Sequence, residues 1–267
     1  MRRRLRALCL TLAAFGGAAL AAEDRYPDLA AAYLVEVGET TLWAGGQGRR
    51  LPPASLTKLM TALLVVEDYR PDEWVTVSPR AAAATGARVG LRAGTRLKVS
   101  DLLAATLVRS ANDTCLALAE HYAGSETAFV VRMNRRAETL GLNDTRFANA
   151  CGFDAPGHYS TVGDLAILAR LAMQFPVFAE LVKQRDVQIQ DARGAHYTLR
   201  NTNALVGTYP GTLGIKSGFT NGAGRCIAAL VERKGVQVLL IMLNAQDRWW
   251  DAVGVLEHAF DHAPAQR

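Results

Sequence analysis

Strand-like runs of apolar residues lie near both ends of the chain, whereas the middle repeats its apolar residues at helical spacing. The runs predict a hairpin near the N-terminus and adjacent antiparallel strands in the last third: residues 31–37, 40–46, 212–220, 225–233 and 236–244. Such an order predicts an α/β (α+β) fold. One antiparallel sheet would be built from both termini and packed against helices, with a helical subdomain in between.

The helical middle of the chain is punctuated by capping and turn residues. A helix begins at Ser55, and another begins at Ser100-Asp101. The pattern predicts further helices over residues 110–121, 125–141, 161–173 and 247–260, and shorter strands over 73–78, 186–190 and 195–200. A long loop rich in Gly, Pro and Asn occupies residues 142–161.

The first 22 residues differ from the rest. Four arginines precede an apolar run and a small-residue end, which is the pattern of a secretory signal peptide cleaved after Ala21 or Ala22. The alternative is a retained membrane anchor, but the short apolar core and the alanine-rich end argue against it. No basic amphipathic segment follows the last predicted helix, so we expect no C-terminal membrane anchor.

The net charge is close to zero once this segment is removed, so it indicates no particular class of partner. The signal holds four of the 30 Lys and Arg residues, which leaves 26 basic against 25 acidic residues. No basic stripe with interleaved aromatic residues is present, so the sequence indicates no nucleic-acid partner. Arg132, Arg135 and Arg136 lie together and are expected to form a solvated helix face.

Three cysteines remain after the signal: Cys115, Cys151 and Cys226. An odd number allows at most one disulfide and one free thiol in an oxidising compartment, and the spacing fits no metal site. Cys115 and Cys226 lie in apolar runs and are expected to be small buried residues. Cys151 lies in the long loop and is left without an assignment.

The first cluster with candidate chemistry is "PPASLTKLM". Pro52 and Pro53 do not continue a helix, so Ser55 is expected at a helix N-terminus, where free N–H groups stabilise negative charge. Lys58 follows one turn later and could act as a base if burial depresses its pKa. The alternative is an N-cap serine beside a lysine that reaches out to solvent.

Two further clusters carry polar residues in apolar surroundings. Ser110-Ala111-Asn112 falls at a break between two helices, where it could alternatively be a capping pair. Lys216-Ser217-Gly218 lies inside a predicted strand. There a cation and a hydroxyl could face a cleft, with the glycine letting a ligand approach the backbone. The alternative for Lys216 is an edge-strand lysine that deters aggregation.

S-x-x-K, S-x-N and K-[ST]-G in this order form the signature of penicillin-binding proteins and class A β-lactamases. Together with "GFDAPGHYST" and the surrounding segments, they make residues 31–260 resemble the low-molecular-weight penicillin-binding proteins that are serine D-alanyl-D-alanine carboxypeptidases. The resemblance implies a β-lactamase/penicillin-binding transpeptidase-like fold, with residues 23–267 as one D,D-peptidase catalytic domain in the periplasm. Peptidoglycan stem peptides would be the substrates and β-lactams covalent inhibitors, without a metal or cofactor.

The resemblance also implies roles. Ser55 would attack the carbonyl between two D-alanines, Lys58 would take its proton, and Ser110 would relay a proton to the leaving amine. Substrate binding would fall to Asn112, to Lys216 and Ser217 at the terminal carboxylate, and to Gly218. The backbone N–H groups of Ser55 and Phe219 would bind the oxyanion. A charged Lys216 would help to keep Lys58 neutral.

The chain departs from many relatives in two ways. We expect it to lack a β-rich second domain, as smaller endopeptidase-type members do, and Ala111 and Ser217 stand where many relatives have Gly and Thr. An endopeptidase that cuts cross-links is therefore an alternative. A β-lactamase is another, although residues 142–160 contain no glutamate and offer only Asp144 and Asp154 to activate water.

A non-catalytic penicillin-binding or cell-wall-binding module is a third alternative, and the intact Ser55, Lys58 and Lys216 argue against it. Two other residues near the motifs stay outside the predicted site. His158 is expected to be a structural loop histidine that helps cap the helix after Thr161. Arg248, after the final strand, could assist carboxylate binding, but it is not included among the predicted site residues.

Overall fold

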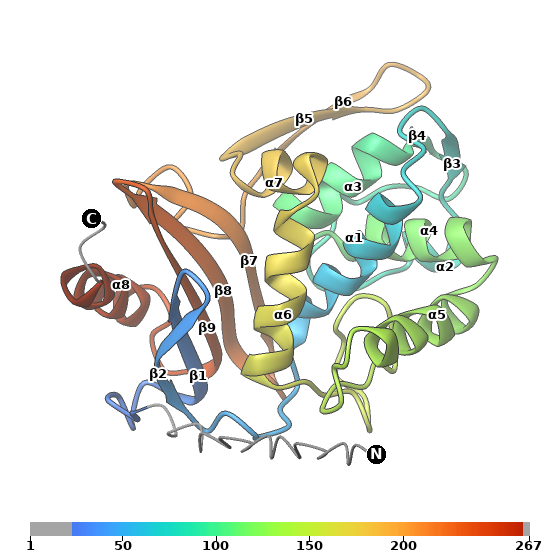
Figure 1. Ribbon diagram of the computed structural model, residues 1–267. Helices are drawn as coiled ribbons and strands as arrows, with labels where there is room; N and C mark the ends of the chain where they lie inside the picture. The colour runs from blue at the N-terminus through green and yellow to red at the C-terminus, as the bar shows by residue number, and fades with distance from the viewer. Residues whose placement is uncertain (1–22, 264–267) are drawn as a thin grey trace, which may run out of the picture.

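A five-stranded antiparallel sheet in the order β2-β1-β9-β8-β7 forms the centre of the computed structural model, which describes residues 23–263 (Figure 1). Its strands are β1 (Ala30–Val37), β2 (Thr40–Gly45), β7 (Thr212–Thr220), β8 (Gly224–Arg233) and β9 (Val236–Ala245). Ala32 of β1 lies opposite Leu243 of β9, so strands from the two ends of the chain are neighbours. The sheet built from both termini is confirmed. The predicted signal peptide lies outside the described residues.

Helices and two small hairpins surround the sheet. The helical elements are η1 (Ala54–Thr57, a 3₁₀ turn), α1 (Lys58–Glu67), α2 (Pro79–Ala82), α3 (Val99–Val108), α4 (Asn112–Ala123), α5 (Glu126–Thr139), α6 (Val162–Met173), α7 (Pro176–Val182) and α8 (Trp250–His262). The hairpins pair β3 (Trp74–Thr76) with β4 (Arg96–Lys98), and β5 (Asp186–Gln190) with β6 (His196–Arg200). The sequence did not predict α2, α7 or β4, because such short elements show no period.

The sheet is buried on both faces. In β9, Val238, Leu240 and Met242 pack toward α8, whereas Leu239, Ile241 and Leu243 pack toward the helical lobe. Successive side chains of a strand point to opposite faces, so a strand covered on both sides is a continuous apolar run rather than an alternating one. Figure 1 shows α8 on one side of the sheet and α6 with the helical lobe on the other.

Helix α1 is the centre of the helical lobe. Its residues from Lys58 to Val66 are all buried. A helix that is enclosed all round belongs to the core rather than to the surface. Lys58 is the first residue of this helix, and its side chain is enclosed with the rest of the helix rather than exposed to solvent.

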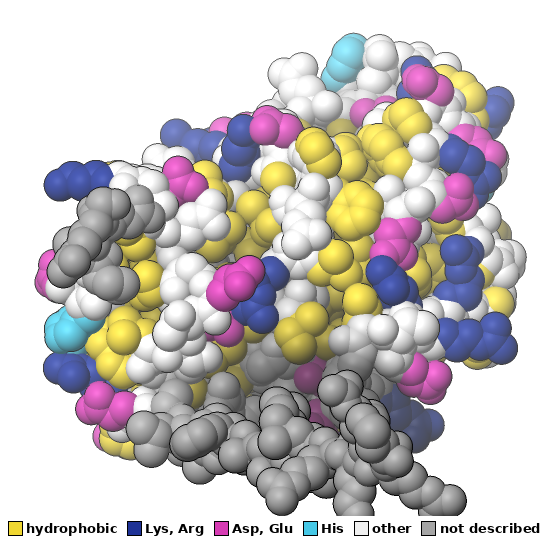
Figure 2. All heavy atoms as spheres, viewed as in Figure 1, with side chains coloured by type: hydrophobic (Ala, Val, Ile, Leu, Met, Phe, Trp, Pro, Cys, Tyr) yellow, Lys and Arg dark blue, Asp and Glu magenta, His cyan; other side chains and the backbone are white. Residues whose placement is uncertain are grey.

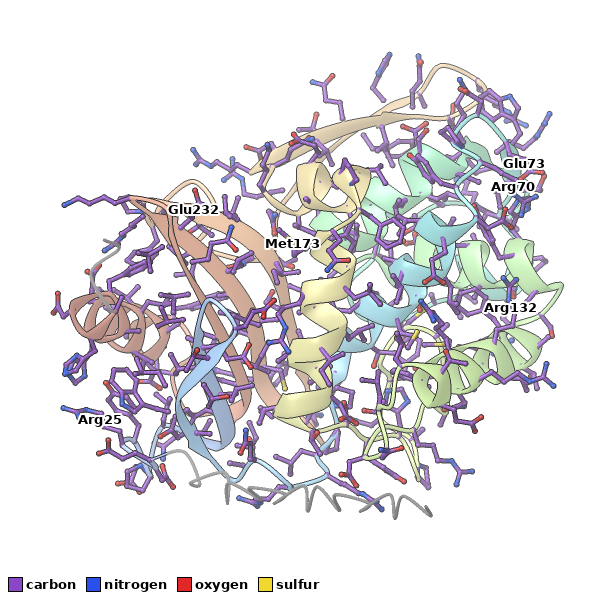
Figure 3. All side chains as sticks on the ribbon, in the orientation of Figure 1. Arg25, Arg70, Glu73, Arg132, Met173 and Glu232 are labelled. Atoms are coloured by element: carbon purple, nitrogen blue, oxygen red, sulfur yellow. A yellow bond between two sulfur atoms is a disulfide. The ribbon has the colours of Figure 1, made fainter. Side chains whose placement is uncertain are left out.

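The surface carries both signs of charge. Figure 2 shows basic and acidic side chains interspersed over the visible face. Arg70 and Glu73, labelled together in Figure 3, form one ion pair of 2.9 Å. On α5, Arg136 pairs with Glu67, and Arg132, also labelled, donates to the Tyr122 carbonyl. Of these two arginines of α5, Arg136 is thus paired with an acid.

Membrane-spanning helices were sought among residues 23–263. No single helix there is long and apolar enough to cross a membrane. Helices α6 and α7 reach that length and composition only as a pair, and they are bent by 107° at the break between them.

A disulfide joins Cys115 of α4 to Cys151 in the loop after α5, at a sequence separation of 36. Cys226 is free and buried. One disulfide and one free thiol is the maximum that three cysteines allow. The expectation that Cys115 is a buried residue is confirmed. The sequence left open which cysteines pair; the long loop folds back onto α4 and brings Cys151 to Cys115.

Removing this disulfide should destabilise the fold. Closing a loop of this length restricts the unfolded chain, so the Cys115→Ala/Cys151→Ala variant should lose about 3 kcal/mol of unfolding free energy. Urea denaturation measures the loss. Cys226→Ala, which removes the free buried thiol, is the control and should lose less. A double variant as stable as the wild type would contradict the prediction.

Candidate active site

Ser55 lies in the 3₁₀ turn η1, immediately before α1. The N-cap alternative is wrong, because neither η1 nor α1 has a side-chain bond at its N-cap. The preceding Ala54 has a φ of +48°, a left-handed conformation that costs energy for a residue with a Cβ. The strain turns the chain sharply, so that half-buried Ser55 is presented at the start of a core helix.

Lys58 is fully buried and its amino group has three partners. Nζ lies 3.2 Å from Ser55 Oγ, 2.7 Å from Asn112 Oδ1 and 2.6 Å from the Cys151 carbonyl. The solvent-exposed alternative for this lysine is wrong. The amide oxygen and the carbonyl are pure acceptors, whereas the Ser55 hydroxyl can also donate. Burial lowers the pKa of Lys58 to about 7.

The loop that supplies the Cys151 carbonyl is held from several sides. Asn149 Oδ1 accepts hydrogen bonds from the N–H groups of Cys151, Gly152 and Phe153. The Ala150 N–H donates to Glu126, and the disulfide ties Cys151 to α4. The carbonyl therefore stays in place against Lys58. The sequence did not predict this contact, since any residue type can supply a backbone carbonyl.

Two glycines pack against the backbone of Ser55. A Cβ on Gly218 of β7 would lie 2.8 Å from Ser55 N, and a Cβ on Gly152 would lie 1.9 Å from the Ala54 carbonyl oxygen. The glycine of the third motif was expected to admit a ligand; here it admits the turn that carries Ser55. Phe219 follows in β7 with its ring largely in solvent, 58% exposed.

The second motif occupies the break between α3 and α4, as predicted. Ser110 has a φ of +61° and is buried, and Ala111 is the N-cap of α4, without a side-chain capping bond. The alternative of a capping Ser-Asn pair is therefore wrong. Asn112 directs its amide oxygen to Lys58 because Nδ2 donates to the Thr85 carbonyl at 2.7 Å.

The neighbouring Asp113 was missed by the sequence reasoning. It is fully buried, and its carboxylate accepts hydrogen bonds from the N–H groups of Val89, Gly90 and Leu91. These bonds fasten the loop after α2 to the start of α4. The Asn112 N–H also donates to the Ala87 carbonyl. The loop therefore stays beside the second motif.

Lys216 and Ser217 are both buried in β7, an edge strand of the sheet. The aggregation-deterring alternative for Lys216 is wrong, because the side chain is 1% exposed and does not reach the solvent edge. Nζ donates to the Ser217 carbonyl at 3.0 Å. Burial, then the charges of Lys58 and Arg248, lower the pKa of Lys216 well below its usual value. For Lys58, burial rather than the second cation is the cause of the shift.

Thr202 and Arg248 join this side of the site. Ser217 Oγ donates to the Thr202 carbonyl at 3.0 Å, and the Thr202 N–H donates to Val108 at the end of α3. Arg248 donates to the Gly218 carbonyl, while its buried Nε has no hydrogen-bond partner. Thr202 lies in an Asn-Thr-Asn stretch whose role the sequence did not indicate.

His158 supports the fold of the site. Its Nε2 lies 2.7 Å from the Thr57 hydroxyl, and its Nδ1 accepts from the Ala148 N–H. Burial lowers the pKa of this imidazole to about 4. The histidine is therefore neutral and structural, as expected. It does not cap α6, because Thr161 does so with its own hydroxyl.

The described residues offer no group of three or more His, Cys, Asp or Glu side chains that could hold a metal ion. What the site does contain is a serine at a strained turn, a buried lysine of lowered pKa and a second buried lysine. Such a set suits nucleophilic attack by Ser55 with Lys58 as its base.

Comparison with known proteins identifies a family. The sequence model of D-alanyl-D-alanine carboxypeptidases matches residues 26–247. The chain belongs to the D-alanyl-D-alanine carboxypeptidase family. The resemblance to low-molecular-weight penicillin-binding proteins is thereby confirmed.

Individual relatives of this family differ in the activity that their names state. The chain is 31% identical to D-alanyl-D-alanine carboxypeptidase DacF of Bacillus subtilis, over 82% of this chain and 58% of the relative. It is 34% identical to the D-alanyl-D-alanine endopeptidase of Escherichia coli, over 73% of this chain and 64% of the relative. The chain thus spans about six tenths of the length of these family members.

The fold of this chain is similar to that of a solved D,D-transpeptidase structure. The crystal structure of the Streptomyces K15 DD-transpeptidase matches with a TM-score of 0.82 at 26% identity, over 89% of this chain and 99% of the other. The predicted fold class, a penicillin-binding transpeptidase-like fold with an antiparallel sheet against helices, is confirmed.

The close approach at Gly152 can be tested by stability. Gly152→Ala should lose about 3 kcal/mol or more, because the new Cβ meets the Ala54 carbonyl and φ is +88°. Gly141→Ala is the matched control: φ is +72° with nothing within 4 Å, so it should lose only about 1 kcal/mol. Urea unfolding compares the two. Equal losses of unfolding free energy in the two variants would show that the contact of residue 152 with the Ser55 turn does not contribute to the cost of the substitution.

Proposed function

We propose that this protein is a serine D,D-peptidase that hydrolyses the D-alanyl-D-alanine bond of peptidoglycan stem peptides through an acyl-enzyme. Release of the terminal D-alanine, a carboxypeptidase reaction, is the proposed main activity. The observation that carries the proposal is the set of three contacts at the Lys58 amino group. The names of the family members support the substrate class.

The Lys58 contacts suit a base better than a cation. A neutral amine has two hydrogens and one lone pair. Asn112 Oδ1 and the Cys151 carbonyl can only accept, so they take the two hydrogens, and the lone pair is left for the Ser55 hydroxyl. With a pKa near 7, about half of the lysines carry no proton at neutral pH. The hydroxyl proton then passes to Nζ as Ser55 Oγ attacks.

The remaining proposed roles follow from position. The N–H groups of Ser55 and Phe219 would bind the oxyanion, because the β7 backbone approaches Ser55 N at Gly218. Asn112 Nδ2 uses one hydrogen on Thr85 and keeps the other for the substrate amide. Ser110, in its left-handed conformation beside Asn112, would pass a proton to the leaving amine.

Lys216 and Ser217 are proposed to bind the terminal carboxylate. Arg248 joins them, because its unpartnered Nε is a donor beside the same strand and its guanidinium remains charged. A bound carboxylate would also restore the proton on Lys216 by opposing the burial that lowers its pKa. The Ser217 hydroxyl would then turn from the Thr202 carbonyl to the substrate.

Neither weak candidate for activating a deacylating water supports a β-lactamase. Asp144 is paired with Arg50 at 2.6 Å, and Asp154 accepts hydrogen bonds from Thr220 and Gly222. An endopeptidase remains the second candidate, supported by the relative of that name. The proposed location is the periplasm after removal of the predicted signal, and the disulfide supports an oxidising compartment.

Incubation of the purified protein with intact muropeptides and with a hydrolysable β-lactam tests the activity. Mass spectrometry should find muropeptides shortened by one alanine, and the β-lactam bound to the protein as a stable adduct. Dimers converted to monomers would favour the endopeptidase, and rapid drug turnover would overturn the proposal. Ser55→Ala should lose at least about 10³-fold in rate, since a catalytic nucleophile is removed.

The acylation rate should depend on pH in one direction. Because Lys58 must be neutral to accept a proton and its pKa is about 7, kcat/KM should rise through this value and level off above about 8. Stopped-flow acylation by penicillin from pH 5 to 9 measures the profile. A rate that stays flat across neutral pH would exclude Lys58 as the titrating base.

A further inference from the structure

One peptide group of β7 carries the proposed oxyanion donor on one side and a hydrogen bond from an arginine on the other. The Gly218 carbonyl and the Phe219 N–H belong to one planar trans unit, so they point in opposite directions. Arg248 donates a hydrogen bond from Nη1 to the Gly218 carbonyl. Because the unit is rigid, a bond that fixes its carbonyl also fixes the direction of its N–H.

The donor in this hydrogen bond is a charged group. A guanidinium stays protonated in proteins, and a hydrogen bond from an ionised donor is about twice as strong as one between neutral groups. Such a bond also polarises the peptide group that accepts it, which makes the opposite N–H a better donor. Arg248 Nη1 therefore acts on the reacting carbonyl through the Phe219 N–H, without contacting the substrate itself.

The ring of Trp249 holds this guanidinium in place. Its centroid lies 4.5 Å from Arg248 Cζ, within the range of a cation–π contact. The ring covers the face of the guanidinium, whereas the N–H groups lie in its plane and stay available to acceptors. The backbone of Trp249 is fixed in turn: its N–H donates to Asp247 Oδ1 at 3.3 Å, and the Asp247 N–H donates to Asp251 at 3.1 Å.

We propose that Arg248 and Trp249 are positioning residues of the oxyanion site. The guanidinium, held by the Trp249 ring, fixes the peptide group between Gly218 and Phe219 so that its N–H faces the reacting carbonyl. This inference rests on the proposed peptidase function and adds how its oxyanion donor is oriented. It is separate from the carboxylate role proposed for Arg248, because that role uses Nε and this one uses Nη1. The two roles predict different results for a compound without a carboxylate.

Acylation by benzylpenicillin and by its methyl ester, which has no carboxylate, tests the proposal. Stopped-flow kinetics give the second-order rate constant for each compound. Trp249→Leu removes the ring and should slow both compounds about tenfold, which is less than the roughly 10²–10³-fold cost of losing a whole oxyanion donor. Trp249→Phe keeps an aromatic face against the guanidinium and should restore most of the rate. Trp250→Leu, the matched control at a position that is 79% exposed, should react like the wild type.

Arg248→Gln supplies a second variant that does not depend on how residue 249 packs. It should slow the methyl ester at least as much as Trp249→Leu does, although the ester offers no carboxylate to Nε. An unchanged rate with the methyl ester in both variants would overturn the inference, because only the carboxylate role would remain.

Circular dichroism checks that each variant is folded. If Trp249→Phe were as slow as Trp249→Leu, the contact between ring and guanidinium would not be the cause, and the role of Trp249 would be overturned. Failure of the proposed function looks different: wild-type protein would then form no adduct with benzylpenicillin.

Discussion

A single buried amino group sets the requirements that the rest of the site meets. An amine enclosed on all sides must have every hydrogen accepted, and the two acceptors around Lys58 come from distant parts of the chain. The Asn112 oxygen is supplied by the start of α4, and the Cys151 carbonyl by the loop after α5. Each of these is in turn held by groups whose side chains never touch the serine.

These supports form a shell around the reactive pair. Asn149, Glu126 and the disulfide hold the loop, Thr85 fixes the orientation of the Asn112 amide, and Asp113 fastens the loop that contains Thr85. Their common effect is to keep the distance between Ser55 and Lys58 short without a direct strong bond between the two. A rigid environment of this kind lets proton transfer proceed with little rearrangement.

Much of the fold and of the candidate site could be predicted from the sequence, because local patterns of residue type indicate it. The strands at both ends, the break before Asn112 and the polar residues of β7 follow from periodicity and from polar groups in apolar runs. The contacts made by backbone atoms could not be predicted, since the Cys151 and Thr85 carbonyls leave no signature in residue type. The same holds for the pairing of Cys115, which depends on how a long loop returns to α4.

The rejected alternatives for the two lysines share one physical cause. The sequence suggested solvent-facing alternatives for Lys58 and Lys216, because lysine is rarely buried. Both are enclosed, since α1 is covered on all sides and β7 is covered at its edge by η1. Burial of this kind depends on tertiary packing, which a local window of sequence does not contain.

The antiparallel sheet has a consequence for when this site can first exist. Strand β9 pairs with β1 on one side and β8 on the other, so the N-terminal hairpin has no partner in the sheet until the last strands have been made. Gly218, which abuts the Ser55 turn, belongs to the same late segment. Contacts across nearly the whole chain close slowly, because the entropy of loop closure opposes them. A nascent chain that already contains Ser55, Lys58 and Asn112 therefore holds no assembled site, and reactivity arises only as the C-terminal strands join the sheet.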